Sequence, residues 1–243
     1  MRTELTGSTA LITGAGRGLG RAIALHLADM GAAVVAADLD AETAKATAVA
    51  VEDLGLPAMA VEMDVSDDAS VTAGVDRVER EMGGFEILVN NAGVDHTVPV
   101  TGMTTEAWQQ VIGVNLSGPF LLSRLTFQHL SERRRPGHIV NIVSTAAKRA
   151  WANASAYHAS KWGLLGLTHA LHVEGREAGI AVTAVVAGGM RTPFILDRFP
   201  DVDVDTLQDP ESVARTVGFV LTAPEGSVIP EVMVIPTRET SWP

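Results

Sequence analysis

The chain has 243 residues, of which 47% are hydrophobic and none is cysteine, and its formal net charge is -11. The absence of cysteine excludes disulfides, thiolate catalysis and cysteine-ligated zinc, and it is typical of a reducing compartment. No basic stripe is available to neutralise phosphates, so we expect no nucleic-acid partner. The sequence contains neither an apolar signal-peptide core nor an apolar stretch of membrane-spanning length, which predicts a soluble cytoplasmic protein.

In the first part of the chain, short apolar runs alternate with segments whose apolar residues recur every three or four positions. The short runs predict strands at residues 9–13, 32–37, 57–63 and 87–89. The periodic segments predict helices at residues 21–30, 41–54 and 67–82. Strands that alternate with helices in this way favour a parallel sheet with helices on both faces.

The second part continues the alternation with longer segments. Helices are expected at residues 104–130 (with a break indicated at Gly118-Pro119), around Tyr157, and at 210–221, and strands at 138–143, 181–186 and 228–235. The irregular segment 187–209 has the length of a lid or binding loop. We therefore predict one α/β domain over residues 1–243, a Rossmann-type doubly wound sheet of seven mainly parallel strands. Residues 187–209 would form the substrate loop and residues 236–243 a C-terminal tail.

A glycine-rich loop joins the first predicted strand to the first predicted helix. Its pattern is Thr13-Gly14-x-x-x-Gly18-x-Gly20, which differs from the common G-x-G-x-x-G. A strand, a glycine loop and a helix N-terminus together aim backbone N–H groups at a phosphate. The loop therefore indicates a dinucleotide site, with an ordinary turn as the alternative.

Asp38 and Arg17 bear on which dinucleotide would bind. Asp38 ends the second predicted strand, about 20 residues after the glycine loop, where a carboxylate can bind a ribose 2′-OH. It would repel a 2′-phosphate, so it favours NAD over NADP. Arg17 favours NADP, because a guanidinium in the loop could hold a 2′-phosphate. We give Asp38 more weight, since like charges in contact are costly whereas Arg17 can point to solvent.

Tyr157 is the only tyrosine and lies four residues before Lys161 in a predicted helix. Residues i and i+4 share a helix face, and an ammonium beside a phenol favours the phenolate. With cofactor bound, we expect a phenol pKa well below the free value of about 10. Ser144 stands at the end of the fifth predicted strand, and Asn115 lies in the long predicted helix. Taken alone, these two could be a strand-end hydroxyl that satisfies a backbone group and a helix-bending polar residue.

With these motifs in this order, the sequence resembles the short-chain dehydrogenase/reductase family in its compact form, over residues 5–235. The motifs that carry the resemblance are the glycine loop, Asp64-Val65, Asn90-Asn91-Ala92-Gly93, Asn115, Ser144 and Tyr157-x-x-x-Lys161. The resemblance implies that Tyr157 is the general acid/base and that Ser144 polarises the substrate oxygen. It also implies that Lys161 lowers the phenol pKa and binds the nicotinamide ribose, and that Asn115 positions a water linking Lys161 to solvent.

The resemblance further implies a set of cofactor contacts. These are Gly14, Arg17, Gly18, Leu19, Gly20, Asp38, Asp64, Val65, Asn91, Ala92, Gly93, Tyr157, Lys161, Gly188 and Thr192. We expect Asn91 to brace the sheet while Asn90 and Gly93 approach the nucleotide. Asp64 and Val65 would face the adenine.

Two segments depart from the family pattern. Ala187-Gly188 stands where the family usually has Pro-Gly, and residues 236–243 replace a glycine-rich ending. The first departure adds backbone freedom beside the nicotinamide. For the second, we expect Trp242 to pack on a neighbouring subunit of a homodimer or homotetramer, with a frayed terminus as the alternative.

The remaining chemistry-bearing residues give weaker signals. Candidates for the pocket lining are His96, Lys148, Arg149, Trp151 and Phe194. His169 and His172 have helical spacing but no third ligand, so no metal is expected. The acidic residues of segment 187–209 mildly disfavour anionic substrates.

We therefore predict an NAD(H)-dependent oxidoreductase that interconverts a secondary alcohol and a ketone. The alternatives are an NADPH-dependent biosynthetic ketoreductase and a non-enzymatic dinucleotide-binding regulator. The complete set of Ser144, Tyr157, Lys161 and Asn115 argues against the regulator, which has no need of all four.

Overall fold

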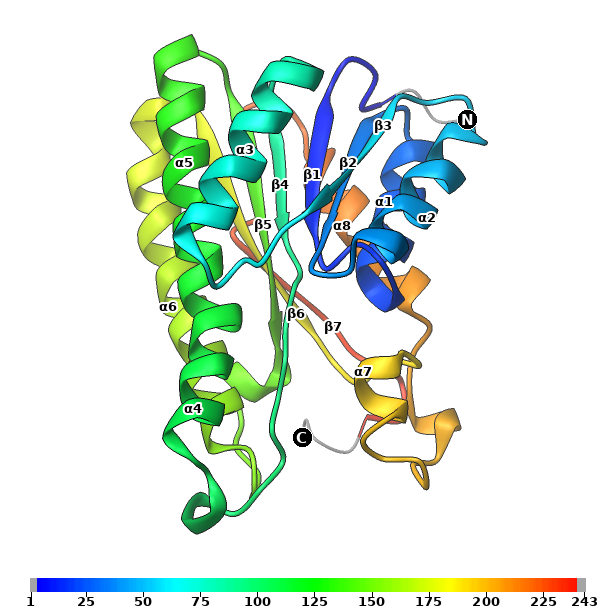
Figure 1. Ribbon diagram of the computed structural model, residues 1–243, viewed down its shortest axis with the longest axis vertical. Helices are drawn as coiled ribbons and strands as arrows, with labels where there is room; N and C mark the ends of the chain where they lie inside the picture. Colours follow the sequence, from blue (N-terminus) through cyan, green and yellow to red (C-terminus); the bar gives the residue numbers. More distant parts are fainter. Residues whose placement is uncertain (1–3, 240–243) are drawn as a thin grey trace.

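The computed structural model describes residues 4–239, and these contain a single seven-stranded sheet with the order β3-β2-β1-β4-β5-β6-β7 (Figure 1). Every neighbouring pair of strands is parallel. The strands are β1 Thr9–Thr13, β2 Ala33–Asp38, β3 Ala58–Glu62, β4 Ile87–Asn90, β5 Gly137–Ser144, β6 Ile180–Ala187 and β7 Glu231–Val234. The predicted doubly wound sheet is thus confirmed, and it is parallel throughout.

Helices cover both faces of the sheet (Figure 1). On one face lie α1 Gly18–Asp29, α2 Ala41–Glu52 and α8 Pro210–Leu221. On the other lie α3 Asp68–Met82, α4 Thr105–Ile112, α5 Gly118–Arg133 and α6 Ser155–Ala178. A short helix, α7 Pro193–Leu196, lies in the segment after β6. None of the helices in residues 4–239 is both long enough and apolar enough to cross a bilayer.

The strands are mainly apolar because both faces of the sheet are covered. In β1, Leu11 packs into the cluster under α3 and α5, whereas Ala10 and Ile12 pack into the cluster under α1 and α8. All three are fully buried. Continuous apolar runs in the sequence therefore correspond to strands at the centre of a three-layer molecule.

The predicted helix over 104–130 is not one regular helix. A π-helical turn, Gly113–Ser117, joins α4 to α5 and contains Asn115. Pro119 lies in the first turn of α5, directly after the π-helical turn, and it has no N–H to donate. Single π-helical turns inside helices frequently mark functional sites.

Two other boundaries differ from the sequence-based expectation. Helix α1 begins at Gly18, inside the predicted loop, and β7 begins only after Pro230, which cannot donate to a neighbouring strand. Segment 187–209 contains α7 and a 3-10 turn at Val204–Thr206. Trp242 lies outside the described residues, so its packing on a neighbouring subunit stays a prediction.

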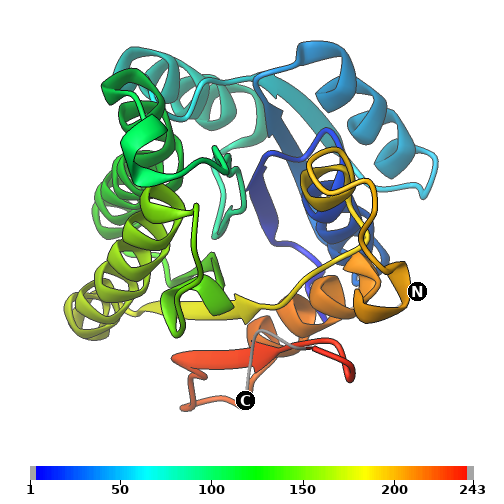
Figure 2. The same cartoon turned by 90° about the horizontal axis from the view of Figure 1, so that it is seen from below.

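Segment 187–209 lies at the carboxyl-terminal end of the sheet. Figure 2 looks onto this end, with the gold segment that contains α7 on one side and the green helices α4 and α5 on the other. In parallel sheets with helices on both faces, ligands bind at this end of the strands. The fold thus brings the predicted substrate loop and the strand-end motifs to the same end of the molecule.

Candidate active site

A cleft of about 650 Å³ opens at the carboxyl ends of the strands. It runs from the glycine loop past the ends of β1, β2 and β4 to the end of β5 and segment 187–209. The predicted site residues that line it are Gly14, Arg17, Gly18, Leu19, Asp38, Asp64, Val65, Asn91, Ala92, Gly93, Ser144, Tyr157, Lys161, Gly188 and Thr192. Gly20 and Asn115 belong to the predicted set but do not line the cleft.

The glycine loop is shaped by close backbone contacts. Gly14 and Gly18 have φ of 61° and 55°, a left-handed conformation that favours glycine. A Cβ at Gly20 would lie 2.0 Å from the Gly14 carbonyl oxygen. Glycine is therefore needed at position 20 because the loop lies too close to leave room for a side chain. The Asn91 amide donates to the Thr13 and Gly14 carbonyls, at 2.9 and 3.2 Å. Asn91 thus braces the end of β1, as the sequence predicted.

Asn90 does not approach the cleft, contrary to the sequence-based expectation. Its side chain is buried, and Nδ2 donates to Asn141 Oδ1 at 2.8 Å. Asn141 in turn donates to Thr168 Oγ1 of α6 at 2.9 Å. Because side chains alternate along a strand, Asn90 points under α5 and α6 while Asn91 reaches the loop. Asn90 is therefore part of a buried polar network in the core.

The carboxylate of Asp38 is held at the edge of the glycine loop. Oδ2 accepts a hydrogen bond from the Gly16 N–H at 2.8 Å, and Oδ1 accepts one from Asp40 N–H at 3.1 Å. The Arg17 side chain is 73% exposed, and its Nη1 lies 3.9 Å from Asp197 Oδ2. As expected, Arg17 can therefore point away from the loop, whereas Asp38 is fixed to it.

Ser144, Tyr157 and Lys161 meet at the other end of the cleft. Ser144 is the last residue of β5, and its hydroxyl hydrogen-bonds the Tyr157 phenol and accepts from the Ala146 N–H at 3.1 Å. Lys161 Nζ donates to the Ile142 carbonyl at 2.9 Å and lies 5.7 Å from the Tyr157 ring centroid. Strand β5 and helix α6 thus bring the three side chains together, as the sequence predicted.

Burial dominates the titration of this pair. Desolvation raises the pKa of Tyr157 to about 12, although the hydrogen bond with Ser144 opposes the rise. Desolvation also lowers the pKa of Lys161 to about 8. In the chain alone, the phenol pKa therefore moves in the opposite direction to the one expected for the cofactor complex. The reason is that removing the phenolate from water outweighs the hydrogen bond with Ser144 and the attraction of Arg198.

Asn115 holds the segment that follows β4. Its Oδ1 accepts from the Val94 N–H at 2.8 Å, and its Nδ2 donates to the Val94 carbonyl at 2.9 Å. Nδ2 also donates to Ser160 Oγ of α6 at 3.1 Å. The amide is engaged with the chain at both ends, which makes it a brace between the segment after β4 and the helix that carries Tyr157.

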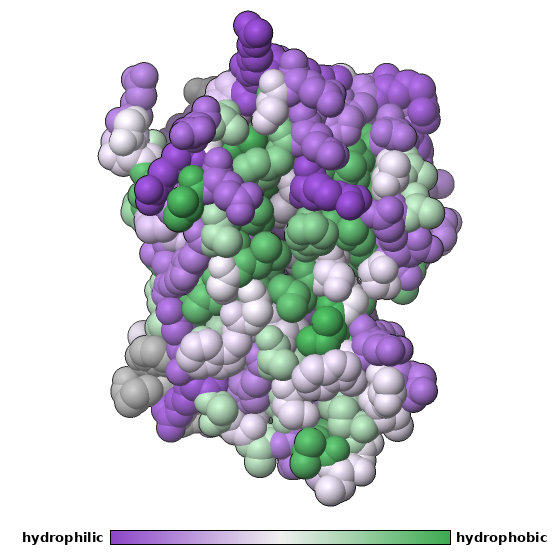
Figure 3. Space-filling view, turned by 90° about the vertical axis from the view of Figure 1, so that its left-hand side faces the viewer, coloured by the Kyte–Doolittle hydropathy of each residue, from purple (hydrophilic) through white to green (hydrophobic). Residues whose placement is uncertain are grey.

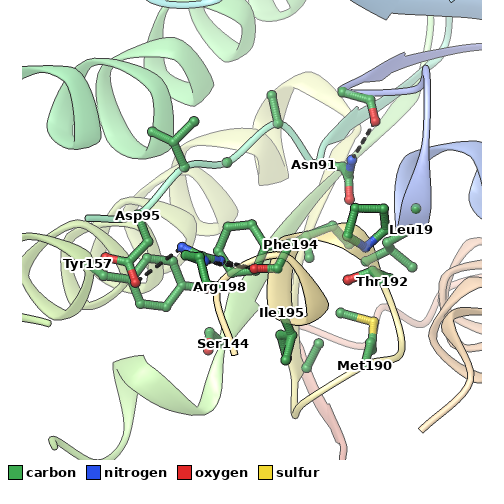
Figure 4. Close-up of a pocket in the computed structure, with 18 of the residues that line it drawn as sticks. Leu19, Asn91, Asp95, Ser144, Tyr157, Met190, Thr192, Phe194, Ile195 and Arg198 are labelled. Carbon is green, nitrogen blue, oxygen red and sulfur yellow. Dashed lines mark hydrogen bonds and ion pairs between the residues drawn. The ribbon is translucent and has the colours of Figure 1, made fainter. Parts of the chain in front are cut away.

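Two residues beside Tyr157 were not identified from the sequence (Figure 4). Arg198, from the segment after α7, forms an ion pair with Asp95, Nη1 to Oδ2 at 3.3 Å. Its guanidinium lies 3.7 Å from the centroid of the Phe194 ring, which is 5.8 Å from the ring of Tyr157. Asp95 lies just beyond the Asn90–Gly93 motif, and Arg198 lies in a segment without a repeating pattern. No sequence signal could therefore have paired them.

The two departures from the family pattern contact each other. Glu239, in the C-terminal tail, lines the cleft, and its Oε2 accepts a hydrogen bond from the Gly189 N–H at 3.2 Å. A Cβ at Gly188 would lie 2.7 Å from the same carboxylate and 2.8 Å from Pro236 Cδ. The tail therefore packs on the segment in which this chain lacks the proline.

Of the five residues suggested for the pocket lining, Trp151 and Phe194 line the cleft. The other three do not: His96 contacts Gln110 at 2.8 Å, Lys148 pairs with Glu231 at 2.7 Å, and Arg149 lies outside the lining. His169 also contacts Glu231, at 3.3 Å. Residues 4–239 contain no group of three or more side chains that could hold a metal ion.

Comparison with known proteins shows the same family over most of the chain. A family model described as short chain dehydrogenase matches residues 8–202. The chain is 39% identical over 202 residues to 3beta-hydroxysteroid dehydrogenase 1 of Eggerthella lenta, which covers 83% of this chain and 77% of that protein.

Solved structures of similar proteins have the same fold. The 3-ketoacyl-(acyl-carrier-protein) reductase from Brucella melitensis complexed with NADH is 33% identical with a TM-score of 0.87, covering 96% of this chain and 99% of that one. A metagenomic short-chain oxidoreductase in complex with NADP is 34% identical with a TM-score of 0.84 and the same coverage. The matched residues 8–202 include the glycine loop, Ser144 and Tyr157.

Proposed function

The chain belongs to the short-chain dehydrogenase family of oxidoreductases, and on this premise we propose that it interconverts a secondary alcohol and a ketone with NAD(H). The observation that carries the proposal is the shape of the cleft. Ser144, Tyr157 and Lys161 converge at one end, and the glycine loop and Asp38 form the other. A single cleft can therefore hold a dinucleotide along its length and a small alcohol at its inner end.

The residues present fit a nicotinamide dinucleotide. Left-handed Gly14 and Gly18 bring the backbone to the cleft surface at the N-terminus of α1, which suits a pyrophosphate. Near Lys161, a Cβ at Gly93 would lie 3.9 Å from Nζ, so the missing side chain leaves room beside the ammonium. Gly188 and Thr192 line the same end of the cleft. The bound cofactor supplies the hydride acceptor for oxidation and the hydride donor for reduction.

The side chains at the inner end have the chemistry that this reaction needs. Ser144 and Tyr157 together offer two hydroxyls to one substrate oxygen. In oxidation, Tyr157 removes the hydroxyl proton, and in reduction it returns that proton to the carbonyl oxygen. Ser144 donates to the oxygen on which negative charge develops. Lys161, charged below its lowered pKa of about 8, favours the phenolate that oxidation requires. The brace that Asn115 forms holds α6, and the predicted water relay stays a proposal.

Asp38 supports NAD rather than NADP. Its carboxylate is fixed at the glycine loop by the Gly16 N–H, and a 2′-phosphate there would meet a negative charge. The similar solved structures hold NADH in one case and NADP in another. The test is kcat/KM with NAD and with NADP. We expect NAD to be preferred and Asp38→Asn to reduce the preference. A strong preference for NADPH would favour the biosynthetic ketoreductase.

The test of the activity is NADH absorbance with a panel of secondary alcohols and ketones. Tyr157→Phe should lower kcat by about 10³-fold, within the usual contribution of a general acid/base, while the Kd for NADH stays unchanged. Retained turnover in this variant would contradict the role of Tyr157. A wild type that binds NADH but converts no member of the panel would favour the regulator.

Exposed apolar side chains on the outer helices support a homodimer or homotetramer. Trp108 of α4, Phe120 of α5, and Trp162 and Val173 of α6 are between 39% and 57% exposed. The face that carries these helices shows apolar residues gathered at its centre (Figure 3). Light scattering tests the oligomeric state, with Trp162→Glu expected to lower the mass of the assembly.

The single sheet supports one domain over residues 1–243, with 187–209 as the substrate loop. The proposed cytoplasmic location rests on the sequence alone.

A further inference from the structure

We propose that the Asp95–Arg198 ion pair makes the cleft selective for neutral, apolar, ring-bearing alcohols and ketones over their carboxylate-bearing analogues. The inference deepens the proposed function and rests on it for the identification of Tyr157 as the reacting end of the cleft. It assigns a specificity role to two residues, one on each side of the phenol.

The lining near Tyr157 is aromatic and aliphatic. Its apolar members are Trp151, Phe194, Ile195, Phe199, Val202 and Leu207. Such a lining favours an alicyclic or aromatic ring, because the ring replaces water against apolar surface. A carboxylate taken into the same lining loses its hydration and needs a cationic partner in exchange. Charge selectivity therefore depends on which cations the cleft offers.

Three cationic side chains line the cleft among the described residues: Arg17, Lys161 and Arg198. Arg17 lies in the glycine loop, at the cofactor end, and Lys161 is tied to the Ile142 carbonyl. Arg198 is thus the cation that a substrate carboxylate would use. Whether it is available depends on its own partner, Asp95.

The position of Arg198 does not depend on Asp95. Nε donates to the Phe194 carbonyl at 2.8 Å, Nη2 donates to the same oxygen, and the guanidinium stacks on the Phe194 ring (Figure 4). The ion pair with Asp95 is made through Nη1. Removing the charge of Asp95 would therefore leave the guanidinium in place with one N–H group free to bind an anion.

The carboxylate of Asp95 is only partly satisfied by its partners. Its side chain is 9% exposed, Oδ2 accepts from Thr97 Oγ1 at 3.1 Å, and Oδ1 is buried without a hydrogen-bond partner among residues 4–239. At the phenol, Asp95 raises the pKa of Tyr157 by more than Arg198 lowers it. An entering carboxylate would meet an arginine that is already paired, beside a partly satisfied carboxylate.

The test compares two ligands that differ in charge but share one ring system, 2-naphthoate and methyl 2-naphthoate. Their Kd values are measured by calorimetry on the NADH-saturated protein. We expect the wild type to bind the ester at least about tenfold more tightly, which corresponds to one desolvated charge without a partner. Asp95→Asn keeps the size of the side chain and frees Nη1. It should shift the ratio of the two Kd values toward the carboxylate by about tenfold or more.

Two further variants separate this effect from general changes in charge or folding. Asp201→Asn removes the same charge from an exposed position of segment 187–209, which carries Arg198, and should leave the ratio unchanged. Arg198→Gln leaves Asp95 unpaired and should weaken carboxylate binding further while retaining ester binding. The double variant Asp95→Asn/Arg198→Gln should again prefer the ester, because no cation is left to pair with the carboxylate.

These Kd measurements test the selectivity separately from the proposed activity, because binding of the two ligands needs no turnover. Equal or tighter binding of 2-naphthoate by the wild type would overturn the proposal and identify Arg198 as a carboxylate receptor. An unchanged ratio in a folded Asp95→Asn protein would also overturn it, as would the failure of the wild type to bind either ligand. If Asp95→Asn does not fold, the wild-type ratio and Arg198→Gln still decide.

Discussion

The two ends of the cleft are built differently. At the cofactor end, the surface is mainly backbone: the glycine loop, the ends of β1 and β4, and the N-terminus of α1, with Asn91 bracing it from beneath. At the substrate end, side chains from four separate segments meet, and the Asp95–Arg198 ion pair joins two of them beside Tyr157. A backbone surface depends on a short local motif, whereas a surface of side chains depends on where a long segment lies.

The two ends of the cleft also differ in how their charged side chains are paired. At the cofactor end, backbone N–H groups hold the Asp38 carboxylate, which forms no ion pair within the described part of the chain. The substrate end pairs its carboxylate, Asp95, with a guanidinium. The first arrangement suits recognition of ribose hydroxyls, and the second reduces the net charge beside an apolar lining.

Gly20→Ala is the change that should affect the backbone-built end most. The new Cβ would lie 2.0 Å from the Gly14 carbonyl oxygen, so the loop has to move. We expect the Kd for NADH to rise about tenfold or more and the free energy of unfolding to fall by about 1–3 kcal/mol. Calorimetry and urea unfolding measure the two effects.

The matched control is Gly166→Ala, also a helical glycine, whose Cβ would have no atom within 4 Å. It should leave NADH binding unchanged and stabilise the fold by up to about 1 kcal/mol. Normal NADH binding by Gly20→Ala would show that the loop is less tightly packed than its contacts indicate.

Lys161→Met should stabilise the fold while removing activity. Burial lowers the pKa of Lys161 from 10.5 to about 8, which costs on the order of 3 kcal/mol of folding free energy at neutral pH. The lost bond to the Ile142 carbonyl offsets about 1 kcal/mol of the gain, so we expect a net increase of about 2 kcal/mol at pH 7. Urea unfolding across pH measures it.

The sign of this effect depends on pH. Above 10.5 the lysine is neutral in both states, so the burial penalty is absent; the penalty is present in full below about pH 8. The advantage of the variant should therefore shrink as the pH rises from 8 to 10.5. Lys45→Met, at an exposed position of α2, should show no such dependence. A constant difference for Lys161→Met would contradict the buried, desolvated lysine.

Glu239→Met tests whether the C-terminal tail supports the substrate end. The substitution removes the acceptor of the Gly189 N–H, which should lower the free energy of unfolding by about 1 kcal/mol and raise the substrate KM several-fold. Glu239→Gln retains an oxygen acceptor and should stay close to the wild type. If both variants behave alike, the hydrogen bond is not what joins the tail to the cleft.

The smallest expected effect is a shift of the pH–rate profile for alcohol oxidation, in which we propose that the phenolate of Tyr157 acts as the base. Asp95 raises the pKa of Tyr157 and Arg198 lowers it, so the profile should move to lower pH in Asp95→Asn and to higher pH in Arg198→Gln. Asp201→Asn should leave it in place. Shifts in the same direction for both variants would show that the two charges do not act on the phenol.

Much of the cofactor end could be predicted from the sequence because its determinants are local. The alternating pattern predicted the doubly wound sheet, whereas the order of the strands came from the structure, in which the chain crosses from β3 at one edge to β4 beside β1. Gly14, Gly18 and Asp38 lie at the carboxyl ends of their strands, so any fold with that sheet brings them to one edge. Ser144 and the Tyr157–Lys161 pair were predictable for the same reason, since β5 and α6 place them together.

The sequence by itself thus determined the sheet, the glycine loop and the three residues at the inner end of the cleft. Only the tertiary structure decided what lies beside them. It placed the Asn90 side chain inside the core, because the alternation of side chains along β4 directs that side chain beneath α5 and α6. It also joined Asp95 to Arg198 and Glu239 to Gly189, across separations of more than a hundred and of fifty residues. Such pairs form only after distant segments have packed, so no local pattern of residues encodes them.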